Sequence, residues 1–168
     1  MSGTTLVIFA ISFALAGSVA VIFFFYKKEI GGAYDAVQGS QVVDTDAGPI
    51  EYAEKGVGNP LLSIHGAGGG FDQSLVLASE SVGSGFRIIA PSRFDYLRTP
   101  VSKDSSPGAQ ATAHAALLAK LNVSNAIIVG VSAGARSAVE FALRYPDLVA
   151  SLILLVTGYI LALQASCI

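Results

Sequence analysis

The pattern of apolar and polar positions divides this chain into two parts. Positions 4–26 carry no charged side chain, and the twenty residues from Leu6 to Phe25 are mostly apolar. That length is enough to cross a bilayer core of about 30 Å as a helix. Beyond residue 41, short apolar runs typical of buried strands alternate with segments of helical periodicity. The pattern predicts one transmembrane helix followed by an α/β domain.

The charges around the apolar segment indicate whether it is a membrane anchor or a signal peptide, and which orientation an anchor has. Lys27 and Lys28 close it and no Lys or Arg precedes it, so the charge bias favours an uncleaved single-pass anchor whose C-terminal side is cytoplasmic. A secretory signal peptide, cleaved near Ala14-Leu15-Ala16, is the competing interpretation, although such peptides normally have a positive start and a shorter apolar core. A buried helix of a soluble domain is a third interpretation, and the all-round apolar end of the segment argues against it.

The alternation after the anchor predicts a mostly parallel, doubly wound sheet with right-handed crossovers. We expect an anchor at 1–28, a turn-rich linker at 29–41 and a partial α/β domain at 42–168. The expected strands are 41–43, 50–54, 61–64, 86–90, 127–131 and 149–156, and the expected helices are 71–82, 107–121 and 135–143.

One motif that carries chemistry lies between an expected strand and the helix that follows it. It is Gly130-Val131-Ser132-Ala133-Gly134, a Gly-x-Ser-x-Gly pentapeptide in the strand–turn–helix context of a nucleophile elbow. Small residues two positions before and after the serine let strand and helix approach, which exposes the serine hydroxyl at the carboxyl edge of the sheet. A small-residue turn that merely allows packing is the alternative interpretation.

A glycine-rich loop follows an earlier buried strand. The run Leu61-Leu62-Ser63-Ile64 leads into His65-Gly66-Ala67-Gly68-Gly69-Gly70. Glycines let backbone N–H groups turn toward a common point, as they do in oxyanion and anion sites. A phosphate-binding loop is the alternative, but the segment lacks the Gly-Lys-Ser/Thr ending of one such motif and the Gly-x-Gly-x-x-Gly spacing of the other.

With a His-Gly loop after one strand and Gly-x-Ser-x-Gly after a later one, the chain resembles the α/β-hydrolase superfamily over about residues 42–156. The resemblance implies that Ser132 is the nucleophile and that the N–H groups of Ala67 and Ala133 form the oxyanion hole. It also implies hydrolysis of the ester, amide or thioester bond of a small acyl substrate through an acyl-serine, without a cofactor. The residues that would support the two loops are His65, Gly66, Gly68, Gly130 and Gly134.

Two further residues are candidates for acid–base chemistry. Asp95 stands where the arginine-rich loop of α/β-hydrolases usually has a glycine. We therefore expect a positive φ there, which Asp tolerates better than most residues, and not a catalytic acid. His114 lies in the expected helix 107–121, and we expect it at the helix surface.

Composition excludes several function classes. The net charge is −2, 52% of residues are apolar, and the ten Lys and Arg residues are scattered, which argues against a nucleic-acid partner. The single cysteine, Cys167, has no partner for an intrachain disulfide. The Cys and His residues have no metal-ligand spacing, so we expect no metal site.

The resemblance is incomplete towards the C-terminus. In α/β-hydrolases the catalytic acid and histidine follow the elbow helix, but no Asp, Glu or His occurs after Asp147. A serine hydroxyl without a base is a weak nucleophile at neutral pH. We therefore find no catalytic histidine or acid and expect impaired activity in a truncated hydrolase whose last strand, 149–156, exposes an unpaired apolar edge.

Two other functions stay open at this point. The chain is compatible with a catalytically inactive, membrane-anchored binding or scaffold module that retains the glycine loop. It is also compatible with a membrane protein unrelated to hydrolases, with a second hydrophobic segment at 148–165, although the preceding α/β pattern argues against this.

Overall fold

The computed structural model describes residues 2–36, 38–156 and 159–164. The chain divides into two compact units, Met1–Gln38 and Gly39–Ile168.

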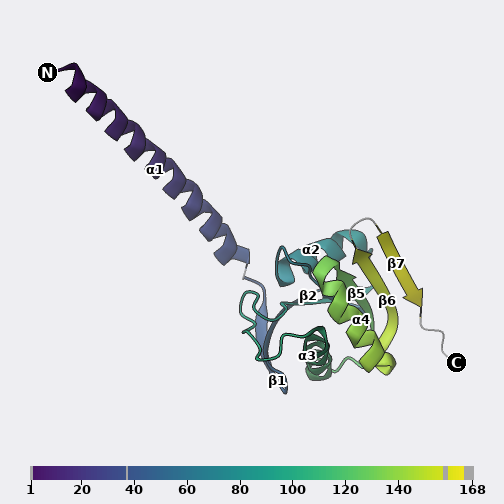
Figure 1. Ribbon diagram of the computed structural model, residues 1–168. Coiled ribbons are helices and arrows are strands. Elements are labelled where there is room, and N and C mark those ends of the chain that lie inside the picture. The colour runs from purple at the N-terminus through teal and green to yellow at the C-terminus, as the bar shows by residue number, and fades with distance from the viewer. Residues whose placement is uncertain (1, 37, 157–158, 165–168) are drawn as a thin grey trace. The chain divides into compact units, whose positions relative to one another are not determined.

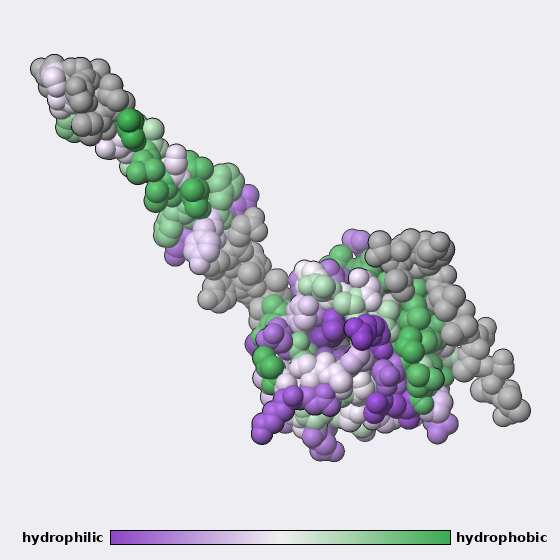
Figure 2. All heavy atoms as spheres, in the orientation of Figure 1, coloured by the Kyte–Doolittle hydropathy of each residue, from purple (hydrophilic) through white to green (hydrophobic). Residues whose placement is uncertain are grey.

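The first unit contains one long helix, α1, Gly3–Ala36 (Figure 1). Its segment Ile11–Lys28 has a mean hydropathy of 1.5 and no buried side chains, and Figure 2 shows hydrophobic surface along the helix. By length and composition this helix is able to cross a membrane, a criterion that a signal sequence near the N-terminus also meets. Because α1 continues to Ala36, much of the expected linker at 29–41 is helical. Gly31 and Gly32 each lower helix stability by only about 1 kcal/mol, which does not end the helix.

In the part of the chain that the structure describes, the second unit is built on a seven-stranded sheet with the order β1-β2-β4-β3-β5-β6-β7. The four central strands are parallel to one another, whereas β1, β2 and β7 run antiparallel to their neighbours. The sheet is therefore mixed, with the expected parallel strands at its centre. The strands are β1 Gln41–Thr45, β2 Gly48–Lys55, β3 Asn59–Ile64, β4 Phe86–Pro91, β5 Ala126–Val131, β6 Val149–Val156 and β7 Tyr159–Gln164.

Helices cover both faces of this sheet: α2 is Phe71–Ser81, α3 is Pro107–Lys120 and α4 is Ala135–Arg144. Successive residues of a strand point to opposite faces, and neighbouring residues of the central strands accordingly belong to different cores. Leu62 and Ile128 pack in a core with residues of α3 and α4, whereas Leu61 and Val129 pack with Ala78 of α2. α3 packs against α4, whereas α2 contacts β2, β3 and β4. This arrangement confirms the predicted doubly wound α/β fold.

The C-terminal strands correct two expectations. β6 is not an unpaired edge, because β7 pairs with it antiparallel from Val156↔Tyr159 to Ser151↔Gln164. The backbone groups of the apolar tail thus satisfy those of the neighbouring strand, which removes the exposed edge expected there. The described residues of the range 148–165 include the two strands Val149–Val156 and Tyr159–Gln164, so the interpretation of that range as a second membrane segment is wrong.

Candidate active site

The two sequence motifs meet at one edge of the sheet. Ile64 of β3 pairs in parallel with Gly130 of β5, so the glycine loop and the elbow both begin at the carboxyl ends of neighbouring strands. A Cβ built on Gly66 would lie 3.3 Å from the Cβ of Ser132. The glycine loop therefore lies so close to Ser132 that little room is left for a side chain between them.

Ser132 has the backbone conformation of a strained turn. Its φ is +48°, in the left-handed region that costs a non-glycine residue roughly 1–2 kcal/mol. Ser132–Gly134 form a short 3₁₀ turn between β5 and α4, and the serine is exposed. The predicted strand–turn–helix element is thus confirmed, with an accessible serine at its strained position.

The two glycines of the pentapeptide lie where backbones approach most closely. A Cβ on Gly130 would lie 2.6 Å from the Cβ of Ala138 and 2.8 Å from the Cα of Ala135, both in α4. A Cβ on Gly134 would lie 2.5 Å from the carbonyl oxygen of His65 and 2.6 Å from that of Ile64. Only glycine fits these contacts without a shift of the backbone, as the motif predicted.

The glycine loop is braced by side chains from other elements. Gly66 N–H donates to Oε1 of Gln73 at 3.1 Å, and the hydroxyl of Tyr96 donates to the carbonyl oxygen of Ala67 at 3.2 Å. Gln73 lies in the first turn of α2 and Tyr96 in the loop after β4. These contacts fix the peptide group before Gly66 and the peptide group after Ala67. Sequence reasoning missed both residues, and only the position of Gln73 directly after the loop pointed to such a contact.

His65 is buried and both of its ring nitrogens are engaged. Its Nε2 accepts the backbone N–H of Arg93 at 2.8 Å, which places the ring proton on Nδ1, 2.7 Å from the carbonyl oxygen of Gly66. Burial lowers the pKa of His65 to about 4, together with the nearby charge of Arg93 and against the bond to Gly66. His65 therefore links the glycine loop to the loop after β4 and has no free nitrogen with which to accept a proton from Ser132.

His114 contradicts its expected place at the helix surface. It is fully buried, and neither ring nitrogen has a hydrogen-bond partner among the described residues. Burial lowers the pKa of His114 to about 3, helped by the neighbouring charges of His65 and Arg93. The expectation failed because α3 packs against α4 as well as the sheet, which widens its buried face. The spacing of His114 from Ala111 and Leu118 was the available signal.

A buried carboxylate organises the loop after β4. Glu51 of β2 accepts the Nε–H of Arg98 at 2.8 Å and its backbone N–H at 3.0 Å. Ser92 and Ser40 donate their hydroxyls to the same carboxylate at 2.9 and 2.8 Å. Burial raises the pKa of Glu51, but these hydrogen bonds outweigh it and hold the pKa below its ordinary value. Sequence reasoning missed this network because its members lie up to 58 residues apart, as Ser40 and Arg98 do.

Asp95 lies in the loop after β4. Asp95 has a φ of +65°, as expected at a position where the related loops have a glycine. The residue is exposed. Among the described residues, no group of three or more His, Cys, Asp or Glu side chains is placed to hold a metal ion.

Comparison with known proteins agrees with this fold. A family model described as alpha/beta hydrolase fold matches residues 59–166. An uncharacterized hydrolase, YcgS, of Bacillus subtilis is 30% identical over 114 residues, which is 68% of this chain and 40% of that protein. Lipase 1 of Psychrobacter immobilis is 38% identical over 106 residues, 60% of this chain and 33% of the lipase.

A solved structure, an alpha/beta hydrolase fold protein from Nakamurella multipartita, superimposes with a TM-score of 0.65 at 35% identity. The match covers 68% of this chain and 40% of that protein. The aligned part of this chain therefore corresponds to between a third and two fifths of the length of these relatives.

Proposed function

The chain belongs to the α/β-hydrolase fold family, and we propose that it carries the nucleophile and oxyanion-hole part of a serine hydrolase. In this proposal, Oγ of Ser132 attacks the carbonyl carbon of an ester, amide or thioester. The N–H groups of Ala67 and Ala133 donate to the developing oxyanion. The bond to the leaving group breaks, the leaving group takes the serine proton by way of a base, and water then hydrolyses the acyl-serine. No step needs a cofactor.

The observation that carries this proposal is the contact between the strained serine and the glycine loop. Ser132 is exposed at a φ of +48°, and a Cβ on Gly66, directly before Ala67, would lie 3.3 Å from the Cβ of Ser132. A turn that served packing alone has no need of a strained, exposed serine beside a second loop. The name of the Psychrobacter relative, a lipase, supports carboxylic esters as the first substrates to test.

The proposal includes an impaired reaction for the 168-residue chain by itself. The sequence contains two histidines; His65 uses both ring nitrogens, and His114 is fully buried. Neither is free to act as the base for Ser132. The relatives are longer than this chain. In measured serine hydrolases that lack triad members, the oxyanion hole and substrate binding still accelerate the reaction roughly a thousandfold or more over the rate in water.

The test is covalent labelling with a fluorophosphonate, using the full chain in detergent micelles. Exogenous imidazole is added as a replacement base. We expect slow labelling that imidazole accelerates and that Ser132→Ala abolishes. Ser124→Ala, which removes an exposed serine outside the site, is the matched control and leaves labelling unchanged.

Each other outcome has a defined meaning. Labelling that persists in Ser132→Ala overturns the assignment of the nucleophile. A folded protein that stays unlabelled even with imidazole favours the inactive, membrane-anchored binding module, because the family fold would then be present without an activatable serine.

Membrane anchoring is a separate part of the proposal. We propose that residues 4–26 form an uncleaved single-pass anchor with the α/β unit on the cytoplasmic side, since Lys27 and Lys28 follow the apolar stretch. The check is the intact mass of protein extracted from the membrane fraction, combined with protease accessibility from each side. A product that lacks the N-terminal segment would identify a signal peptide instead.

A further inference from the structure

A small cavity lies directly beside the elbow. Its volume is about 180 Å³, and its walls come from the loop after β4, from the start of α3 and from the elbow with the first turn of α4. Ala133, the residue after Ser132, is part of the wall. Cavities that enclose whole small-molecule ligands measure roughly 300–1,000 Å³, so this one fits a single functional group.

The charged side chains of this cavity are both cations. Arg93 and Arg136 line it, and no Asp or Glu is among its lining residues. The chain has five arginines, of which Arg87, Arg98 and Arg144 form ion pairs with glutamates. Among the described residues, no such pair exists for the two arginines of the cavity. The cavity is therefore a place of uncompensated positive charge.

Arg93 is incompletely satisfied within the described part of the chain. Its Nε is shielded from solvent and has no hydrogen-bond partner there. A buried donor without a partner destabilises a protein, more so when it is charged. The guanidinium lies 5.7 Å from the centre of the Tyr96 ring, a contact with a ring face that does not replace the missing acceptor.

Gln110 adds a neutral donor to the same wall. It is 5% exposed, and its Oε1 accepts the backbone N–H of Phe94 at 2.8 Å. That bond fixes the orientation of the amide and leaves the NH₂ group as a donor on a side chain that lines the cavity.

Arg136 stands where a cation does not help its own helix. It lies in the first turn of α4, which has no acidic residue, and the N-terminal end of a helix favours negative charge. The end of α4 and the two guanidinium groups thus add to one positive field. An anion at this point would relieve all three at once.

We propose that this cavity binds an anionic group, a carboxylate or a phosphate, between Arg93 and Arg136 with Gln110 as a further donor. Where that group belongs to the substrate, the inference rests on the proposed function and defines the substrate as an acyl compound with a negative charge near the scissile bond. A free anion bound beside the elbow is the other source of the same chemistry.

The first experiment measures binding without catalysis. Inorganic phosphate and glutarate are titrated calorimetrically into the full chain in detergent micelles. We expect saturable binding at millimolar concentration or below, weakened about tenfold by Arg136→Gln and abolished by Gln110→Glu, whose carboxylate can still accept the Phe94 N–H.

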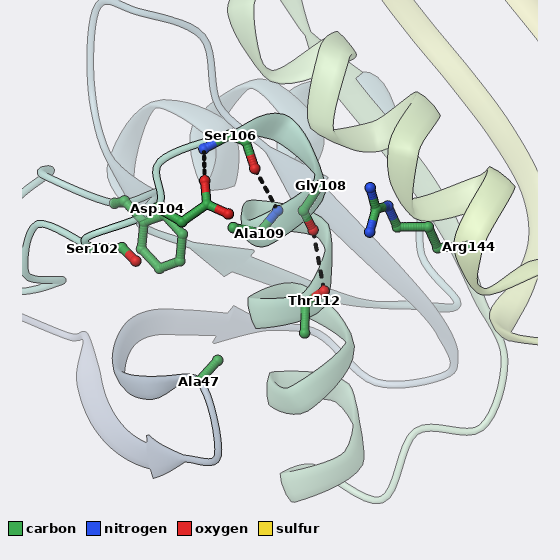
Figure 3. A pocket seen from close by; sticks show the side chains of 9 residues that line it. Ala47, Ser102, Asp104, Ser106, Gly108, Ala109, Thr112 and Arg144 are labelled. Carbon is green, nitrogen blue, oxygen red and sulfur yellow. Dashed lines mark hydrogen bonds between the residues drawn. The ribbon is translucent and has the colours of Figure 1, made fainter.

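The matched control is Arg144→Gln, at the other end of the same helix. Arg144 lines a separate cavity of about 400 Å³ that also contains Asp104 (Figure 3), and it is paired with Glu140 at 2.8 Å. This variant carries the same change in net charge and is expected to bind phosphate normally. Absence of saturable binding, or equal weakening in Arg136→Gln and Arg144→Gln, overturns the proposal.

A second experiment separates the two sources of the anion. With imidazole present, hydrolysis of p-nitrophenyl acetate is compared with that of the mono-p-nitrophenyl ester of glutarate. Preference for the charged ester, competition by phosphate and loss of both in Arg136→Gln assign the anion to the substrate. Phosphate binding without ester preference assigns the site to a free anion.

The two proposals fail separately. Phosphate binding in a protein whose Ser132 is never labelled supports the anion site and contradicts the hydrolase proposal. Labelling of Ser132 in a protein that does not bind phosphate does the reverse.

Discussion

The glycine loop after β3 and the elbow after β5 leave the same edge of the sheet, but they are held by different means. The elbow is fixed by close backbone packing, with Gly134 against the carbonyl oxygens of Ile64 and His65. The glycine loop is fixed by hydrogen bonds from side chains far along the chain, among them Gln73 and Tyr96. The elbow therefore depends on room against backbone atoms. The glycine loop depends on hydrogen bonds from particular side chains and, at Gly69 and Gly70, on room against side chains.

The largest expected effect comes from adding one methyl group to the elbow. In Gly134→Ala the new Cβ meets two backbone oxygens at 2.5 and 2.6 Å, and backbone atoms of the central strand cannot move aside cheaply. We expect the free energy of unfolding to fall by about 4 kcal/mol, measured by denaturant unfolding of the full chain in detergent micelles.

The same substitution in the glycine loop is the matched comparison. In Gly68→Ala the nearest atom is Nε2 of Gln73 at 3.1 Å, the end of a flexible side chain, so we expect a loss of about 1 kcal/mol or less. Equal losses in the two variants would mean that the loops are not held differently.

The second prediction tests the hydrogen bonds that hold the loop after β4, whose Tyr96 in turn contacts the glycine loop. Glu51→Ala removes the acceptor of two serine hydroxyls and of Arg98, and with it the anchor of the loop that carries Tyr96. Breaking a buried ion pair costs about 3–5 kcal/mol, and because Arg98 is 43% exposed we expect about 3 kcal/mol. Disruption of the exposed Arg144–Glu140 pair by Glu140→Ala is expected to leave stability almost unchanged. Similar values for the two variants would contradict a special role of Glu51.

This difference between the loops also explains what the sequence could predict. The elbow was identified because its requirements are local: a strand, two glycines around a serine, and a helix, all within Ile127–Leu143. The same holds for the alternation of strands and helices that defines the fold, because the hydrophobic periodicity of each segment can be recognised from its consecutive residues.

The hydrogen-bond network around Glu51 could not be predicted in this way. Glu51 is one polar residue in an alternating strand, and nothing near it in the sequence indicates that Ser92 and Arg98 will reach it. His114 was misplaced because the packing of α3 against α4 arises only on folding, although its spacing from Ala111 and Leu118 matches the buried face of the helix. Partners brought together only by folding leave no local pattern.

The third prediction uses the two buried histidines, His65 in the glycine loop and His114 in α3. With folded pKa values of about 4 for His65 and about 3 for His114, the unfolded chain takes up protons at the ordinary value near 6.5 before the folded one does. The contribution of the two neutral histidines to stability is therefore fully present above pH 6.5. On acidification the free energy of unfolding falls by about 1.4 kcal/mol per pH unit for each histidine. This fall continues to about pH 4 for His65 and to about pH 3 for His114.

Replacement of the two histidines separates their roles. His114→Leu removes a side chain with no hydrogen-bond partner among the described residues, so stability at pH 7.5 rises by about 1 kcal/mol and the acid dependence is roughly halved. His65→Leu also halves the acid dependence, but it lowers stability at pH 7.5, because the Arg93 N–H loses its acceptor. Unfolding curves from pH 7.5 to 5 measure both, and a slope unchanged in His114→Leu would contradict its burial.

The smallest expected effect concerns Asp95, in the loop whose Tyr96 reaches the glycine loop. Asp95 has a φ of +65°, a conformation that glycine adopts without the steric cost of a Cβ. Asp95→Gly is therefore expected to stabilise the folded state by about 0.5–1 kcal/mol, reduced by the greater entropy that glycine gives the unfolded chain. The matched variant is Asp95→Ala, which keeps the Cβ but loses the tolerance of Asp for this region, and it is expected to destabilise. If Asp95→Ala were as stable as Asp95→Gly, the loop after β4 would not be held in the left-handed conformation at this residue.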